Sequence, residues 1–211
     1  MNKRLNLMKR KICVICEGNE EYDYLERLKS LNVWNDMYDV KCINADGNGN
    51  IPARYQNEYQ EDSYEYIFVF CDTDKKPYEQ YEDIKQKIDM FHGIDGVSKN
   101  IVIFGNPCTL QIICLHWDEL KLNSNAKKIN AKIIKEYTGI DNYKAKKEQR
   151  EILFKSIDVE NYKQLKTRLL SLSEKDYEIN SSNFGLLIKC LENDSDTWIE
   201  KFNYILESCS E

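Results

Sequence analysis

The chain has 211 residues, of which 42% are hydrophobic and 31% are charged, so it can bury a core and is not intrinsically disordered. Only 8 glycines and 3 prolines are present, which excludes collagen-like and low-complexity classes. No apolar run approaches the roughly 20 residues of a membrane span. The net charge of −6 gives no overall signature of nucleic-acid binding.

Charge is distributed unevenly along the chain. Acidic residues predominate over residues 17–99, whereas basic residues predominate over residues 121–170. A protein with an acidic metal site next to a basic surface that binds a polyanion would need this arrangement. Solvated helix faces give the same pattern more often, so charge alone assigns no function.

The N-terminus and the cysteines both indicate a cytoplasmic protein. The basic N-terminus is followed by an apolar stretch, residues 12–16, that is too short for a signal-peptide core. Most of the 8 cysteines lie in apolar runs, where a free thiol behaves as a small hydrophobe. Cys13 and Cys16 have the spacing of a redox or zinc motif. They lie in a predicted strand, where side chains three apart point to opposite faces, so we favour buried thiols.

The first half of the chain alternates between apolar runs typical of buried strands and segments with helical spacing. In chain order, we expect a strand at residues 11–16, a helix at 20–31, a strand at 39–45, a loop at 47–50, a helix at 53–62, a strand at 66–71, a helix at 77–91 and a strand at 100–104. This alternation predicts an α/β fold with a parallel sheet flanked by helices.

After Gly105 the strand signal ends, and the remaining segments have helical spacing. The expected helices are residues 109–117, 125–137, 144–156, 158–172, 181–192 and 195–207. The sequence therefore predicts an α/β half over residues 1–117 and a helical C-terminal half over residues 118–211.

Acidic residues follow two of the predicted strands. Glu17 and a glycine end the first strand, and Glu21 follows in the first turn of the next helix. Asp72 and Asp74 follow the third strand, and side chains two apart in an extended segment point the same way. Carboxylates at the carboxyl ends of parallel strands share one edge of the sheet, where functional groups gather. If the first and third strands are neighbours, Glu17 lies beside the aspartates.

Such a cluster fits a divalent cation, Mg²⁺ or Mn²⁺, because Mg²⁺ takes one or two carboxylates and completes its shell with water and phosphate oxygens. Alternatively, Asp72 and Asp74 cap the following helix or form a turn. We favour the metal site, with Glu17, Asp72 and Asp74 as ligands.

The same residues resemble a Toprim domain, the catalytic fold shared by topoisomerases, primases and several nucleases. The resemblance lies in Glu17-Gly18-x-x-Glu21-x-x-Tyr24-Leu25 after one apolar strand and Asp72-x-Asp74 after another. Asn106-Pro107-Cys108, leading to Leu115-His116-Trp117, further resembles the RloB-like branch. The likeness covers residues 11–117 and extends only loosely into the helical half.

The resemblance implies a small prokaryotic anti-phage defence protein, of the abortive-infection or restriction-linked kind, with a metal-dependent nuclease centre. Glu17 would act as general acid/base or metal ligand, Asp72 and Asp74 would bind the cation, and Glu21 would support the site. One departure is Leu110, where the family often has an acidic residue. If that residue binds a second metal, this chain is a one-metal enzyme or an impaired one.

Other candidates come from the neighbouring sequence. Asn106 presents an amide at a strand end, and His116 either lines the site or is a hydrogen-bonded core residue. With only 2 histidines, the chain has no His-rich zinc site. Lys75 and Lys76 either neutralise a phosphate or lie in a solvated turn. Basic residues of the helical half would form the nucleic-acid track: Lys127, Lys128, Lys132, Lys135, Lys144, Lys146, Lys147 and Arg150.

Three functions are compatible with the sequence. The first is a Mg²⁺-dependent nuclease acting on DNA or RNA. The second is a non-catalytic partner or regulatory module of a defence ATPase, and the third is a structural domain whose acids only cap helices. No membrane partner is expected, and the sequence leaves open a homo-oligomer and a second defence-system protein.

Overall fold

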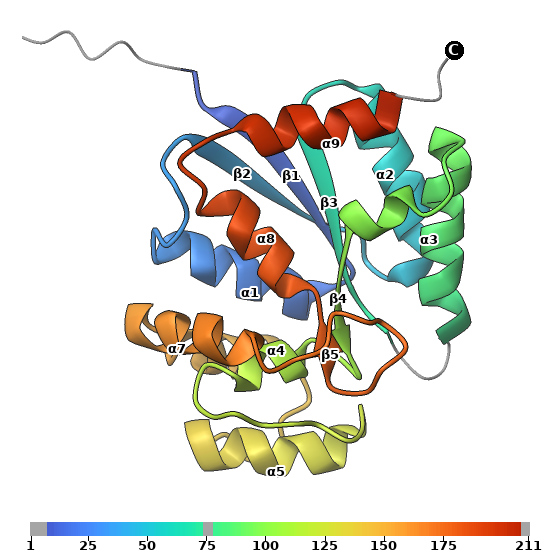
Figure 1. The fold of residues 1–211 in the computed structure, drawn as a ribbon. Helices are drawn as coiled ribbons and strands as arrows, with labels where there is room; N and C mark the ends of the chain where they lie inside the picture. Colours follow the sequence, from blue (N-terminus) through green and yellow to red (C-terminus); the bar gives the residue numbers. More distant parts are fainter. Residues whose placement is uncertain (1–7, 74–77, 208–211) are drawn as a thin grey trace, which may run out of the picture.

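The computed structural model describes residues 8–73 and 78–207, and its centre is a five-stranded sheet (Figure 1). In spatial order the strands are β2 (Tyr38–Asn44), β1 (Arg10–Cys16), β3 (Tyr66–Asp72), β4 (Val102–Asn106) and β5 (Ser181–Ser182). The first four are parallel and β5 is antiparallel to β4. The predicted α/β class and its largely parallel sheet are therefore confirmed.

Helices cover both faces of the sheet. They are α1 (Asn19–Ser30), α2 (Ile51–Gln60), α3 (Tyr78–His92), α4 (Leu110–Cys114), α5 (Lys127–Thr138), α6 (Lys147–Lys155), α7 (Val159–Leu169), α8 (Phe184–Leu191) and α9 (Thr197–Glu207), with 3₁₀ turns η1 (Asn48–Asn50) and η2 (Val97–Asn100). Figure 1 shows α2 and α3 on one face, α1 and α8 on the other, and α4 and α5 near the carboxyl ends of the strands. Within the described ranges, no helix is both long and apolar enough to cross a bilayer.

The central pair of strands, β1 and β3, fixes where the functional groups lie. Both consist almost entirely of buried residues, because each has neighbours on both sides and helices on both faces. Their register places Cys16 opposite Phe70, so the two strands end at the same edge. The chain moves from β1 to β2 on one side and reaches β3 and β4 on the other. The carboxyl ends of β1 and β3 therefore form the topological switch point of the sheet.

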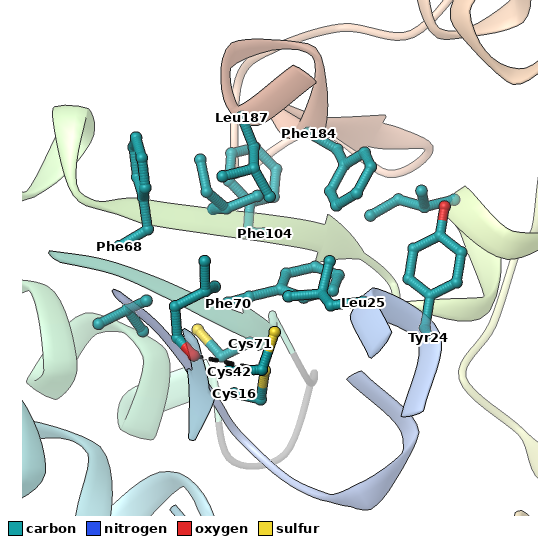
Figure 2. Close-up of a cluster of buried hydrophobic side chains, with 14 of the residues drawn as sticks. Cys16, Tyr24, Leu25, Cys42, Phe68, Phe70, Cys71, Phe104, Phe184 and Leu187 are labelled. Carbon is teal, nitrogen blue, oxygen red and sulfur yellow. Dashed lines mark hydrogen bonds between the residues drawn. The ribbon is translucent and has the colours of Figure 1, made fainter. Parts of the chain in front are cut away.

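The core joins the two halves of the chain. Phe184 of α8 is fully buried, and its ring centroid lies 5.3 Å from that of Phe70 in β3 and 5.7 Å from that of Tyr24 in α1 (Figure 2). Trp198 of α9 packs against Tyr66 and Phe68 at the other end of β3. Residues after 180 thus complete the core that the first half begins.

The predicted absence of strands after Gly105 is wrong at one place. Ser181 and Ser182, expected to begin a helix, form β5 and pair with Asn106 and Gly105. The Ser182 hydroxyl also donates to the carbonyl of Phe104 at 2.6 Å. This short strand is held by hydrogen bonds of two polar residues, so the sequence has no apolar pattern that would predict it.

The cysteines are buried thiols, as expected. Cys13 and Cys16 are fully buried and form no disulfide, so the redox or zinc interpretation of their spacing finds no support. Cys16 and Cys71 occupy late positions in β1 and β3 (Figure 2), and burial raises the pKa of both thiols. Both remain protonated at neutral pH. Cys209 lies outside the described residues.

Replacing Phe184 with alanine tests the shared core. We expect Phe184→Ala to lower the free energy of unfolding by about 3–5 kcal/mol, because it leaves a cavity between α8, β3 and α1. Urea unfolding followed by circular dichroism measures the change. Leu170→Ala, at a side chain that is 86% exposed, is the control and should change it by less than about 0.5 kcal/mol. Equal effects of the two substitutions would contradict a core built on Phe184.

Candidate functional site at the carboxyl ends of β1 and β3

Glu17 lies directly beyond β1 and reaches across to β3. Its amide donates to the carbonyl of Phe70 at 2.9 Å, which extends the pairing of the two strands by one residue. Its Oε2 accepts a hydrogen bond from the amide of Asp72, also at 2.9 Å. The predicted neighbourhood of the first and third strands is confirmed, and it brings Glu17 to Asp72.

Asp72 is held from a third segment, the turn between β4 and α4. Its Oδ1 accepts from both the amide and the hydroxyl of Thr109, at 2.5 and 2.6 Å. Thr109 is fully buried. Hydrogen bonds to a carboxylate are strong and directional, so this pair fixes the orientation of the Asp72 side chain.

Glu21 shapes the turn that follows β1. Its Oε2 accepts from the amide of Gly18 at 3.1 Å, an interaction that satisfies one of the unpaired amides at the start of α1. Glu20, one residue earlier, accepts a hydrogen bond from the hydroxyl of Tyr143. Both side chains therefore have structural partners at the edge where Glu17 and Asp72 meet.

These carboxylates line a cleft of about 470 Å³. Four acidic residues from the strand ends and α1 line it, and we call them the carboxylate set: Glu17, Glu20, Glu21 and Asp72. Four residues from later in the chain line it as well, and we call them the amide-basic set: Asn125, Asn130, Lys144 and Arg150. Cys108, Leu110 and Tyr143 also line it. The cleft thus combines acidic groups from one half of the chain with amide and basic groups from the other.

The segment that carries part of the amide-basic set is anchored on α1. Nε of Arg150 lies 2.7 Å from Oδ2 of Asp23, and its Nη1 donates to the carbonyl of Ala145 at 2.5 Å. The Tyr143 hydroxyl donates to Glu20, and burial together with that neighbouring carboxylate raises the pKa of Tyr143. Tyr143 therefore stays a protonated donor at neutral pH.

Asn106 and His116, both predicted for the site, lie elsewhere. Nδ2 of Asn106 donates to the carbonyl of Asp176 at 2.6 Å, and the residue does not line the cleft. His116 is 1% exposed and its Nε2 lies 2.9 Å from the hydroxyl of Tyr24. Burial lowers the pKa of His116 to about 3, so the ring is neutral. Of its two expected roles, His116 has the position of a hydrogen-bonded core residue.

The predicted basic track is only partly gathered at the cleft. Lys144 and Arg150 line it, and Lys147 lines an adjoining hollow beside α1. Lys128 and Lys132 are exposed on α5. Asp74, Lys75 and Lys76, and the side chain of Lys127, lie outside the described residues.

Sequence reasoning missed Thr109, Asn125 and Asn130. A threonine at a helix start is a common capping residue, so the sequence predicts a turn at Thr109. It does not indicate that Asp72 accepts the hydrogen bonds of this threonine. The amides of Asn125 and Asn130 reach the cleft only through the fold of the second half, which has no spacing that marks them.

A larger cleft of about 760 Å³ lies between α3 and residues 174–189, and none of the predicted site residues that the structure describes lines it. Lys85 within it is 2.5 Å from a carboxylate oxygen of Asp176 and 2.9 Å from one of Glu82. Lys85, Glu82 and Asp176 are thus paired with one another, and we assign this cleft no chemistry.

The strand ends carry carboxylate oxygens, which are the type of donor that a hard divalent cation prefers. Over residues 8–73 and 78–207, no group of three or more His, Cys, Asp or Glu side chains forms a ready metal site. Glu17 and Asp72 both line the cleft, and Mg²⁺ needs only one or two carboxylates from a protein. Comparison with known proteins adds no assignment, because no family model, curated protein or solved structure matches the chain.

Removing the hydroxyl of Thr109 tests its contact with Asp72. We expect Thr109→Val to lower the free energy of unfolding by about 1–3 kcal/mol, because the carboxylate of the partly buried Asp72 loses a donor while the shape of the Thr109 side chain is kept. Urea unfolding at neutral pH measures it. Thr167→Val, at an exposed helical position, is the matched control and should cost less than about 0.5 kcal/mol. A Thr109→Val protein as stable as its control would show that the contact is not formed.

His116 makes stability depend on pH. Its pKa of about 3 in the folded protein lies below the ordinary histidine value of 6.5, so the stability it contributes is present above pH 6.5. That stability is lost as the pH falls from 6.5 towards 3, by up to about 1.4 kcal/mol per pH unit. We expect the stability difference between wild type and His116→Gln to narrow over this range. Asn57→Gln, at an exposed position on α2, is the control for general acid effects. A difference that is constant with pH would mean that the ring titrates normally.

Proposed function

We propose that the chain is a Mg²⁺-dependent, Toprim-type nuclease of the RloB-like kind that cleaves DNA or RNA in prokaryotic anti-phage defence by abortive infection. Mn²⁺ would substitute for Mg²⁺. The observation that carries this proposal is the 2.9 Å hydrogen bond from the Asp72 amide to Glu17, formed at the switch point of the sheet and inside a cleft. The cytoplasm, where the nucleic acid is found, is the proposed location.

The chain's own residues supply the remaining parts of such a site. Glu17 and Asp72 would hold the cation, which when bound polarises the scissile phosphate and promotes deprotonation of water. Thr109 fixes the orientation of Asp72, and Glu21 fixes the turn that carries Glu17. Glu17 is also the group placed to transfer a proton at the cleft. Lys144 supplies a positive charge for a substrate phosphate.

The proposed division of labour gives catalysis to the α/β part and substrate contact to the helical C-terminal half. The amide-basic set comes from residues 125–150, whereas the carboxylate set comes from residues 17–72. This distribution supports nucleic acid as the partner, because an acidic site alone repels a polyanion and a cation with basic neighbours reverses that repulsion.

A second candidate is a non-catalytic partner or regulatory module of a defence ATPase. Leu110 favours it, because this side chain is 7% exposed and lines the cleft at the position where RloB-like proteins often have an acid. An apolar group there provides no ligand for a second cation. Under this alternative the cleft keeps the shape of a nuclease site and does not catalyse cleavage.

Isosteric substitution of the two carboxylates separates the candidates. We expect the purified protein to cleave DNA or RNA when Mg²⁺ or Mn²⁺ is present, and Glu17→Gln and Asp72→Asn each to slow cleavage by at least about 100-fold, because each loses charge at the cation. Gel electrophoresis of labelled DNA and RNA, single-stranded and duplex, measures the rates. Asp83→Asn, at a half-exposed position on α3, is the matched control and should cleave at the wild-type rate.

Two outcomes would contradict the nuclease. One is a wild-type protein that cleaves none of these substrates with either metal. The other is a defence phenotype that survives Glu17→Gln combined with Asp72→Asn, which would favour the regulatory module.

A further inference from the structure

Asn130 of α5 has an unusual environment for a buried amide. The side chain is 2% exposed and lines the cleft. Its Nδ2 donates to Sγ of Cys108 at 3.7 Å, whereas its Oδ1 accepts no hydrogen bond from any residue in the described part of the chain. A buried acceptor without a donor destabilises the folded protein, and at the cleft a ligand can provide the missing donor.

The chemistry of that acceptor restricts what it can bind. An amide oxygen needs a donor, and the phosphate oxygens of a nucleic acid are themselves acceptors at neutral pH. The donors of a nucleotide are the amino and imino groups of its base and, in RNA, the 2′-hydroxyl. Asn130 is therefore suited to contact the nucleoside part of a substrate, whereas Lys144 in the same cleft is suited to its phosphate.

The size of the cleft and the burial of Asn130 exclude a paired base. At about 470 Å³ the cleft is in the range of sites for small molecules, which corresponds to one or two nucleotides. A base within a double helix is stacked and paired, and it must leave the helix before its edge can enter such a site. Single strands, loops and ends present their bases without that cost.

We propose, on the basis of the nuclease function above, that the cleft binds an unpaired nucleotide and that Asn130 accepts a hydrogen bond from its nucleoside. The phosphate then lies towards the carboxylate set and the cation, and the base or sugar lies towards α5. This arrangement makes the protein selective for single-stranded nucleic acid, with a preference set by the donor that reaches Asn130.

Binding measurements test the proposal without requiring cleavage. The full-length protein is titrated into fluorescently labelled oligonucleotides with Ca²⁺ in place of Mg²⁺, and anisotropy gives the dissociation constants. The probes are deoxycytidine and deoxythymidine homopolymers, a cytidine RNA homopolymer and a DNA duplex of equal length. We expect wild type to bind the best single strand at least about tenfold more tightly than the duplex, because the duplex must give up a base pair first.

Asn130→Ala should weaken binding of that strand by about three- to tenfold, the effect of one hydrogen bond. A loss confined to the cytidine polymers identifies a base amino group, and a loss confined to RNA identifies the 2′-hydroxyl; either supports the proposal. Asn57→Ala, an exposed asparagine on α2, is the matched control and should bind as wild type. Because Oδ1 has no donor in the structure, Asn130→Ala should melt at or above the wild-type temperature, and Asn130→Ser provides a second variant if alanine is not tolerated.

Three results would overturn the proposal. They are unchanged binding of every strand by both Asn130 variants, equal binding of duplex and single strands by wild type, and weaker binding of Ca²⁺ alone by Asn130→Ala in the absence of oligonucleotide, which would make Asn130 a metal ligand. The nuclease function is judged separately. Asn130-dependent binding without cleavage contradicts the nuclease alone, and cleavage with Asn130-independent binding contradicts this inference alone.

Discussion

The parallel pairing of β1 with β3 is the constraint on which the site depends. Cys16, the last residue of β1, pairs with Phe70, and β3 continues two residues further, so its last residue, Asp72, lies within a hydrogen bond of Glu17. Neither Glu17 nor Asp72 needs a long loop to reach its partner. Both strands are largely buried in the core, and Phe184, from the C-terminal part of the chain, packs on Phe70 of β3. The geometry of two carboxylates is thus set by the whole core.

A third segment adds to this precision. Thr109 belongs to the turn after β4, and it reaches Asp72 because β4 is the next parallel neighbour of β3. Three consecutive strands of the sheet therefore meet at the cleft through Glu17, Asp72 and Thr109. The second half of the chain completes the cleft with polar groups, so neither half contains the entire candidate site.

Much of the fold could be predicted from the sequence, because its signals are local. Buried parallel strands give unbroken apolar runs, and β3 (Tyr66–Asp72) gives the strongest of them. The proximity of Glu17 and Asp72 could be predicted because both residues lie at strand ends, once the first and third strands were assumed to be neighbours. Asn130 and Thr109 could not be foreseen, since their roles depend on tertiary contacts between segments far apart in the chain. Ser181 and Ser182 were mistaken for a helix start because their pairing uses hydrogen bonds in place of apolar burial.

The thiols at the strand ends have a consequence for durability. Cys16 precedes Glu17 and Cys71 precedes Asp72, so a sulfur atom lies one residue from each of the two carboxylates. Oxidants attack the thiolate, and burial keeps both sulfurs in the thiol form. Because both sulfurs are buried and protonated, they are poor targets for peroxide and similar oxidants.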